Sequence, residues 1–175
     1  VVEWAAAARH VVRLLAGLGL ENKHSMLFFG FAIVVGLLFT PSRRFFAGKW
    51  LWIGGALALA LFVPNIIWEY RHDWATLELL RNVRTSGKNV VLSPPQFVKE
   101  QILFLHPLLC PVWLAGLVSL LFGRLSRLRV LGLTYLVLLA LMIAGKAKNY
   151  YLAPIYPMLF AAGASGHIER ASYWP

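Results

Sequence analysis

Hydrophobic residues are gathered into five segments that contain no Asp, Glu, Lys or Arg and are separated by polar connectors. An α-helix needs about 20 apolar residues to cross a hydrocarbon core about 30 Å thick. The two longest segments have that length, and the shorter ones must use flanking residues or cross where the membrane is thinned. The pattern predicts an all-α, polytopic transmembrane helical bundle. The five segments are residues 25–40, 50–68, 102–123, 130–145 and 149–166.

Basic residues orient these segments across the membrane. The connectors 41–49 and 124–129 each carry three Lys or Arg residues and no acid. Because Lys and Arg concentrate on the cytoplasmic side of membrane proteins, both connectors are expected inside. Residues 69–101 are then expected to form a long outer (periplasmic) loop, since one crossing separates this stretch from each connector.

The outer loop is predicted to contain short surface helices. Residues 74–81 have an amphipathic pattern, and Ser93-Pro-Pro suits the start of a second helix because proline is tolerated in the first turn. Three acids in this region, Glu69, Asp73 and Glu78, are interpreted as solvated or paired surface charges.

The N-terminal part predicts one further element. Residues 11–20 are apolar but short, and residues 21–24 interrupt them, which indicates a helical hairpin or a partly re-entrant element. The bundle then has about five to six crossings. We expect residues 1–175 to form a single transmembrane domain and, since the chain opens with Val1 rather than Met, to be a fragment of a longer protein.

Composition supports lipid as the solvent of this chain. Of its 175 residues, 59% are hydrophobic and 14% are charged, which is too little polar surface for a soluble domain of this length. The net charge of +10 comes from basic residues scattered between the apolar segments, so it indicates topology and no nucleic-acid binding. Cys110 is the one cysteine and the histidines show no ligand spacing, so no disulfide and no metal site is expected from them. No cofactor motif is evident, and dependence on a divalent metal is left open.

The stretch Ala144–Pro157, AGKAKNYYLAPIYP, places two lysines and three tyrosines between two apolar segments. On the predicted topology Lys146 and Lys148 lie outside, where positive charge is disfavoured, and the stretch contains no acid. One interpretation is that they snorkel to the interface beside anchoring tyrosines. The other is that they bind an anion such as a lipid-linked phosphate, with tyrosine hydroxyls supplying directed hydrogen bonds. Pro154 and Pro157 would keep the backbone irregular where such a ligand approaches.

Residues 146–157 resemble the late outer-loop motif of family 39 glycosyltransferases. These are integral-membrane enzymes of the GT-C superfamily, which include the dolichyl-phosphate-mannose-protein mannosyltransferases and the aminoarabinose transferase of lipid A. Further pieces resemble the same family, in the same order, along nearly the whole chain. They are Gly17–His24, Pro64–Trp68, His72–Trp74, Lys88–Asn89, Pro107 and Trp113–Leu117.

The resemblance implies transfer of a sugar from a polyprenyl-phosphate donor to a lipid, glycan or protein acceptor. The reaction is expected at the outer face of the bacterial cytoplasmic (inner) membrane, where fixed cations would stabilise the charge on the departing phosphate. The resemblance assigns Lys146, Lys148, Tyr150 and Tyr151 to the donor-phosphate site. The candidates for lining the cavity are Lys23, His24, His72 and His106.

One part of the family's pattern has no counterpart in this sequence. The family's catalytic acid lies in the first outer loop, and because nothing here matches that loop, we expect the acid upstream of Val1 and an inactive fragment. The alternative is a non-catalytic lipid-phosphate-binding membrane module or a lipid transporter. A transporter predicts polar residues along several crossings, whereas the five apolar segments carry no charge.

Overall fold

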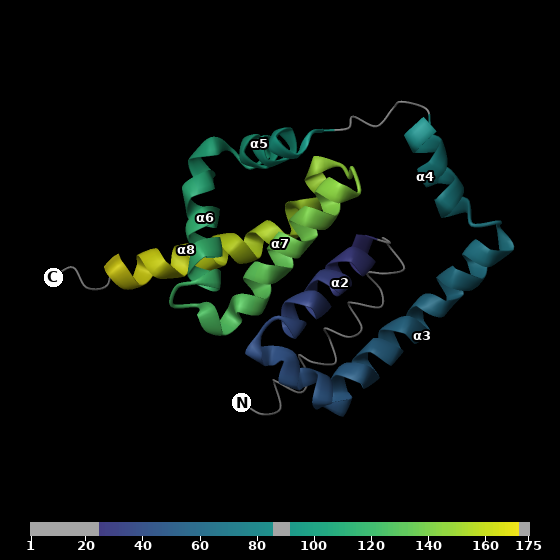
Figure 1. The fold of residues 1–175 in the computed structure, drawn as a ribbon, viewed down its shortest axis with the longest axis horizontal. Coiled ribbons are helices and arrows are strands. Elements are labelled where there is room, and N and C mark those ends of the chain that lie inside the picture. The colour runs from purple at the N-terminus through teal and green to yellow at the C-terminus, as the bar shows by residue number, and fades with distance from the viewer. Residues whose placement is uncertain (1–24, 86–91, 172–175) are drawn as a thin grey trace. The chain divides into compact units, whose positions relative to one another are not determined.

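The computed structural model describes residues 25–85 and 92–171, which form helices and no strand (Figure 1). The all-α prediction is therefore confirmed, while the predicted hairpin before residue 25 lies outside the described residues. Short 3₁₀ segments, labelled η, join several of the α-helices. In chain order the elements are α2 (Ser25–Leu38), η1 (Pro41–Ala47), α3 (Lys49–Arg71), α4 (Ala75–Thr85), α5 (Pro94–Phe104), η2 (Pro107–Leu109), α6 (Cys110–Leu121), η3 (Ser126–Leu128), α7 (Arg129–Ala144), η4 (Asn149–Ile155) and α8 (Tyr156–Ala171).

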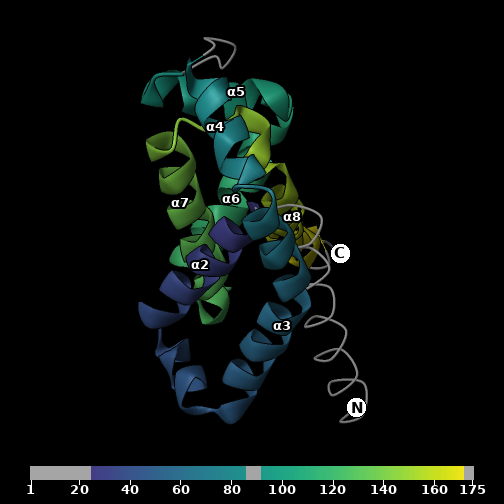
Figure 2. The same cartoon turned by 90° about the vertical axis from the view of Figure 1, so that its right-hand side faces the viewer.

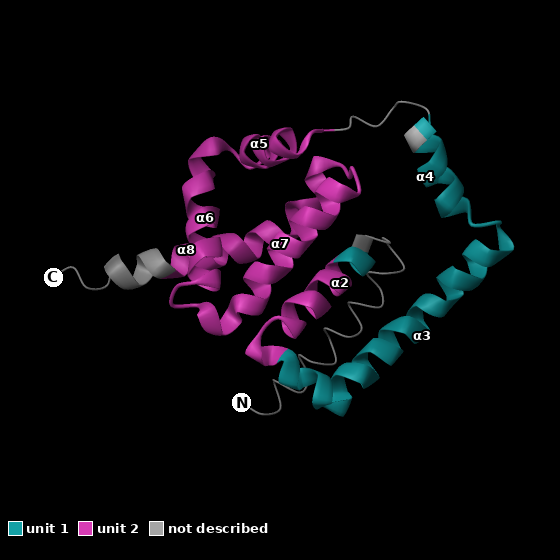
Figure 3. Ribbon diagram, viewed as in Figure 1, with its two compact units in different colours: residues 1–28, 43–89 teal, residues 29–42, 90–175 magenta. Residues whose placement is uncertain are grey.

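The chain divides into two compact units, shown in teal and magenta in Figure 3. Unit 1 comprises residues 1–28 and 43–89, and unit 2 comprises residues 29–42 and 90–175. Unit 1 therefore holds α3 and α4, and unit 2 holds α5 to α8 with most of α2. The expectation of a single transmembrane domain stays a prediction.

Two described helical segments are long and apolar enough to cross a membrane, Lys49–Arg71 and Ser126–Ala144. Two further pairs of helices reach that length together but are bent, so the described residues hold up to four spans if each bent pair crosses once. These segments fit the helical membrane bundle that the apolar pattern predicts. The count of five to six crossings stays a prediction.

Both surface helices expected within residues 69–101 are present. α4 contains the amphipathic stretch, and α5 begins at Pro94, directly after Ser93. The backbone N–H and the hydroxyl of Ser93 donate to Gln96 Oε1, at 3.1 and 2.9 Å. Ser93 and Gln96 form a capping box at the start of the helix. The prediction of a helix start at Ser93-Pro-Pro is confirmed.

The apolar segment 102–123 is not the single straight crossing that its composition suggests. α5 ends at Phe104, and the pair formed by Pro94–Phe104 and Pro107–Leu121 is bent by 93°. The bend lies at His106, whose φ is 72°, followed by Pro107, which has no N–H to continue the helix. α5 consequently contacts η4, next to the end of α7, as Figures 1 and 2 show.

α6 and α8 make the most extensive contact between described elements, and they cross in Figure 1. Two glycines allow their backbones to meet. A Cβ atom on Gly116 would lie 2.0 Å from Leu159 O, and one on Gly163 would lie 2.1 Å from Val112 O. Small residues that permit close backbone approach are a common basis of helix association in lipid, where the hydrophobic effect does not drive helices together.

Arg129, the last residue of the basic connector 124–129 and the first residue of α7, also stabilises α6. Arg129 Nε donates to Leu121 O at 2.7 Å, at the last residue of α6. A cation at this end satisfies a carbonyl that has no partner within the helix and interacts favourably with the helix dipole. Arg129 thus has a structural role in addition to its expected effect on topology.

The α6–α8 contact predicts a strong difference between two Gly→Ala substitutions. Gly116→Ala should destabilise the protein by at least the about 1–3 kcal/mol typical of overpacking, because the atoms it would strike belong to backbone. Gly55→Ala in α3 is the control, since a Cβ there meets no atom within 4 Å and alanine favours helix by about 1 kcal/mol. Thermal unfolding of the purified full-length protein in detergent measures both changes. Equal transition temperatures for the two variants would contradict the close contact.

Candidate functional site

The segment between α7 and η4 carries both lysines of the expected donor-phosphate site. α7 ends in a Schellman motif, in which Lys146 N–H donates to Ile143 O at 3.1 Å and Ala147 N–H donates to Met142 O at 2.9 Å. The residue after the C-cap in this motif is left-handed and is usually glycine. Here it is Lys146, with a φ of 51°, although Gly145 directly precedes it with a φ of −76°.

Lys148, Tyr150 and Tyr151 form one cluster at the start of η4. Lys148 Nζ lies 5.8 Å from the centroid of the Tyr150 ring, which is a cation–π contact. The rings of Tyr150 and Tyr151 meet edge to face, with centroids 5.0 Å apart. Lys146, Lys148 and Tyr150 are exposed, and Tyr151 is half-buried. The Lys148 ammonium group and the two phenol hydroxyls can offer an anion both charge and directed hydrogen bonds.

The two prolines that follow keep this backbone irregular, as the sequence predicts. Pro154 lies within the 3₁₀ segment η4, and the α-helix begins only at Tyr156. Pro157 then occupies the first turn of α8, where its missing N–H removes no helical hydrogen bond.

α5 holds residues 146–151, called the lysine segment from here on, through Asn149. Gln101 Nε2 donates to the backbone O of Asn149 at 3.1 Å, and Asn149 Nδ2 donates to Glu100 Oε2 at 3.4 Å. The stretch itself contains no acid, but the fold brings one to it from 49 positions earlier in the chain. Two neighbouring residues of α5 thus contact both the backbone and the side chain of Asn149.

The same glutamine extends this contact into the core of unit 2. Gln101 is 1% exposed, and Tyr156 donates its hydroxyl proton to Gln101 Oε1 at 3.1 Å. The hydroxyl oxygens of Tyr156 and Tyr135 are 3.3 Å apart, and Tyr135 is the donor because Tyr156 uses its own proton on Gln101. These bonds satisfy buried polar groups that would be costly if left unpaired.

Trp113 of α6 completes the aromatic core around these hydroxyls. Its ring centroid is 5.5 Å from that of Tyr156 and 6.1 Å from that of Tyr135. The side chain is 3% exposed, and its indole N–H has no hydrogen-bond partner among the described residues. The three rings therefore pack mainly through shape and edge-to-face contacts.

The residues expected to line a cavity are distributed along the chain. Lys23 and His24 lie outside the described residues. His72 stacks on Trp68 with ring centroids 4.3 Å apart, and His106 Nδ1 accepts the backbone N–H of Leu108 at 3.3 Å. Both histidines are exposed and make local contacts, so their place in a cavity stays a prediction. Within the described ranges, no three His, Cys, Asp or Glu side chains cluster as metal ligands.

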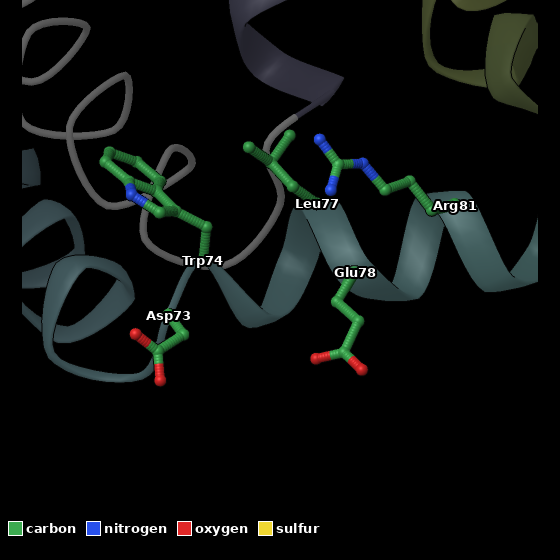
Figure 4. A pocket seen from close by; sticks show the side chains of 5 residues that line it. All are labelled: Asp73, Trp74, Leu77, Glu78 and Arg81. Atoms are coloured by element: carbon green, nitrogen blue, oxygen red, sulfur yellow. The ribbon is translucent and has the colours of Figure 1, made fainter.

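The corner between α3 and α4 contains the His72–Trp74 motif. Asp73 and Trp74 have φ values of 52° and 58°, so two successive non-glycine residues are left-handed. A hollow of about 390 Å³ lies beside this corner. Figure 4 shows Trp74, Leu77 and Arg81 on one side of α4 and the two acids on the other. The lining residues are Asp73, Trp74, Leu77, Glu78 and Arg81.

Glu69 differs from the surface charge that the sequence suggests. It is 5% exposed, and its carboxylate accepts hydrogen bonds from the backbone N–H of Thr76, at 3.1 Å, and from the Thr76 hydroxyl. Thr76 lies in the first turn of α4, so the carboxylate caps the N-terminus of that helix. The chain reversal at residues 72–74 brings the two together, and local sequence does not reveal it. Asp73 and Glu78 are exposed, as expected.

Sequence reasoning missed the residues that hold the lysine segment in place. In the sequence, Gln101 is the last residue of the outer polar stretch 69–101, and Asn149 and Tyr156 are only parts of the motif at residues 146–157. A signal for Gln101 did exist, because it follows Phe97 by four positions and therefore shares its helical face. Phe97 is 2% exposed, so that face is the buried one.

The left-handed backbone of Lys146 predicts an unusual response to glycine. Lys146→Gly should be more stable than Lys146→Ala by about 1 kcal/mol, since alanine keeps the left-handed strain and glycine relieves it. The order should reverse at Lys148, whose φ of −69° suits alanine. Comparing glycine with alanine at each site removes the contribution of the lost lysine side chain. Denaturation of the four full-length variants checks the prediction, and the same order at both positions would disprove it.

Comparison with known proteins adds independent information on part of the chain. Residues 5–68 match the family model described as dolichyl-phosphate-mannose-protein mannosyltransferase. The described part of this range contains α2, η1 and most of α3, and the lysine segment lies beyond it. No curated protein and no solved structure matches the chain. Over residues 5–68 the chain is thus similar to dolichyl-phosphate-mannose-protein mannosyltransferases, which confirms the resemblance to this GT-C-type family for that part.

Proposed function

We propose that the chain is part of an integral-membrane glycosyltransferase that moves a sugar from a polyprenyl-phosphate donor to a lipid, glycan or protein acceptor. The family match supports this class of enzyme, and the apolar helices support its place in a membrane, which we take to be the bacterial cytoplasmic membrane. In this proposal residues 146–151 provide the donor-phosphate side. The catalytic acid belongs to the family's first outer loop, for which the sequence offers no counterpart.

The observation that carries the proposal is the cluster at the start of η4, where Lys148 Nζ lies 5.8 Å from the centroid of the Tyr150 ring and the rings of Tyr150 and Tyr151 meet edge to face. Lys146, two positions before Lys148, is held in a left-handed backbone conformation by the Schellman motif that ends α7. Lys146, Lys148 and Tyr150 are exposed, so their charges and hydroxyl group are open to an anion. Cations next to phenol hydroxyls favour binding of a phosphate.

The chemistry of the proposed donor fits these side chains. When the glycosidic bond to a polyprenyl phosphate breaks, negative charge develops on the departing phosphate oxygens. Lys146 and Lys148 carry compact ammonium groups on flexible side chains, so each can donate hydrogen bonds to phosphate oxygens in several orientations. The Tyr150 hydroxyl can donate a directed hydrogen bond. Such groups stabilise a leaving group more strongly in a low-dielectric site than in bulk water.

Replacing both lysines by glutamine tests the proposal in the full-length protein. Each charge-assisted hydrogen bond contributes about 1.5–3 kcal/mol, so Lys146→Gln with Lys148→Gln should weaken undecaprenyl-phosphate binding by about 100-fold or more. Binding is measured in nanodiscs by titration with the lipid, which reports on the site whether or not turnover occurs.

Lys99→Gln provides the matched control, because this exposed lysine of α5 has the same charge and belongs to the same unit. It should leave binding within about twofold of the wild-type value, as a screened surface charge does. Unchanged binding in the double variant, with normal insertion and folding, would refute the donor-phosphate site. If Lys99→Gln weakens undecaprenyl-phosphate binding as much as the double substitution does, the effect comes from general surface charge and the proposed site is refuted.

A further inference from the structure

Gln101 is the one residue that hydrogen-bonds both to the lysine segment and to the hydroxyl pair in the core, among the contacts described for unit 2. Its Nε2 donates to Asn149 O at 3.1 Å, and its Oε1 accepts from Tyr156 at 3.1 Å. Asn149 lies one position after Lys148 and one before Tyr150. The amide therefore restrains the backbone in the middle of the proposed site.

We infer that Gln101 is a positioning residue, which holds residues 146–151 in the geometry that binds the donor phosphate without itself contacting the donor. This inference rests on the proposed function of the lysines. Gln101 is 1% exposed, so its amide is enclosed by protein, whereas Lys146, Lys148 and Tyr150 are exposed. A buried amide paired at both ends cannot turn away without leaving polar groups unsatisfied, so it is a rigid support.

The support matters because the segment lies outside the α-helices. α7 ends at Ala144 and α8 begins at Tyr156, and the 3₁₀ hydrogen bonds of η4 between them have poorer geometry than those of an α-helix. Fixing a flexible cationic segment before the ligand arrives reduces the ordering entropy that binding would otherwise cost. Loss of the Gln101 contact should therefore appear first as motion of residues 147–151 and then as weaker donor binding.

Gln101→Met tests the inference, since methionine has a similar volume and removes both polar contacts. In the full-length protein, backbone amides of residues 147–151 should exchange hydrogen about tenfold faster, and binding of undecaprenyl phosphate should weaken about tenfold. Thr134→Val is the matched control. Thr134 is 1% exposed, and among the described residues its hydroxyl donates to Val130 O of its own helix, at 2.8 Å, so both readouts should stay unchanged.

A double-mutant cycle separates positioning from general destabilisation. In the Lys146→Gln, Lys148→Gln background, Gln101→Met should weaken binding by much less than tenfold, because only the Tyr150 hydroxyl is left for Gln101 to position. A full tenfold further loss would overturn the inference. If the lysine variants themselves bind normally, the proposed function fails, and the exchange rates of Gln101→Met still decide whether Gln101 holds the segment.

Tyr156→Phe is a second, milder variant for the case in which Gln101→Met does not fold. It removes one hydroxyl and frees Gln101 Oε1 while leaving the bond to Asn149 possible, so exchange should increase by a smaller factor than in Gln101→Met. The inference is overturned if neither Gln101→Met nor Tyr156→Phe, whichever of them folds, changes the hydrogen exchange of residues 147–151.

Discussion

The contact between the backbones of α6 and α8 is the constraint on which unit 2 depends. Gly116 and Gly163 leave no room for a Cβ atom, so the close contact of the two backbones requires glycine at both positions. η4 runs directly into α8 at Tyr156, and the position of α8 therefore sets where the preceding lysine segment lies. The same packing brings the Tyr156 ring against Trp113, 5.5 Å between centroids, and thereby directs its hydroxyl toward α5.

The second constraint is the bend at His106 and Pro107. Proline ends the helical hydrogen bonding there, and the chain turns by 93° between α5 and α6. Without this bend, Gln101 would continue along the axis of α6, away from Asn149. With it, a residue that composition places at the edge of a polar stretch becomes one of the most buried polar side chains in the unit.

Strain is concentrated where apolar helices end. Among the described residues, the non-glycine positions with positive φ are Asp73, Trp74, His106 and Lys146, and each lies at a helix boundary. At these corners a buried polar group supports the chain nearby, as Glu69 does for Thr76 and Gln101 does for Asn149. Hydrogen bonds are stronger in a low-dielectric surrounding than in water, so they can stabilise tight turns that would be unstable in a solvated loop. A rigid turn that presents cations is also what preorganised stabilisation of a phosphate requires.

The sequence by itself determined the class of structure and the position of some of its helices. Uncharged apolar runs cannot expose backbone groups to lipid, so they must become helices, and α3 and α7 follow those runs closely. Ser93-Pro-Pro predicted a helix start, and Pro154 with Pro157 predicted irregular backbone, because these effects are local. The match over residues 5–68 agrees with the resemblance read from ordered motifs.

Only the tertiary structure decided which polar residues are buried and what they contact. Glu69 and Gln101 look like surface residues in the sequence, and their burial depends on chain reversals that bring Thr76 and Asn149 to them. The left-handed state of Lys146 likewise depends on how α7 ends, since Gly145 offered an easier position one residue earlier. Hydrogen bonding between distant segments leaves no periodic trace in a sequence, because it depends on the distance between side chains in space.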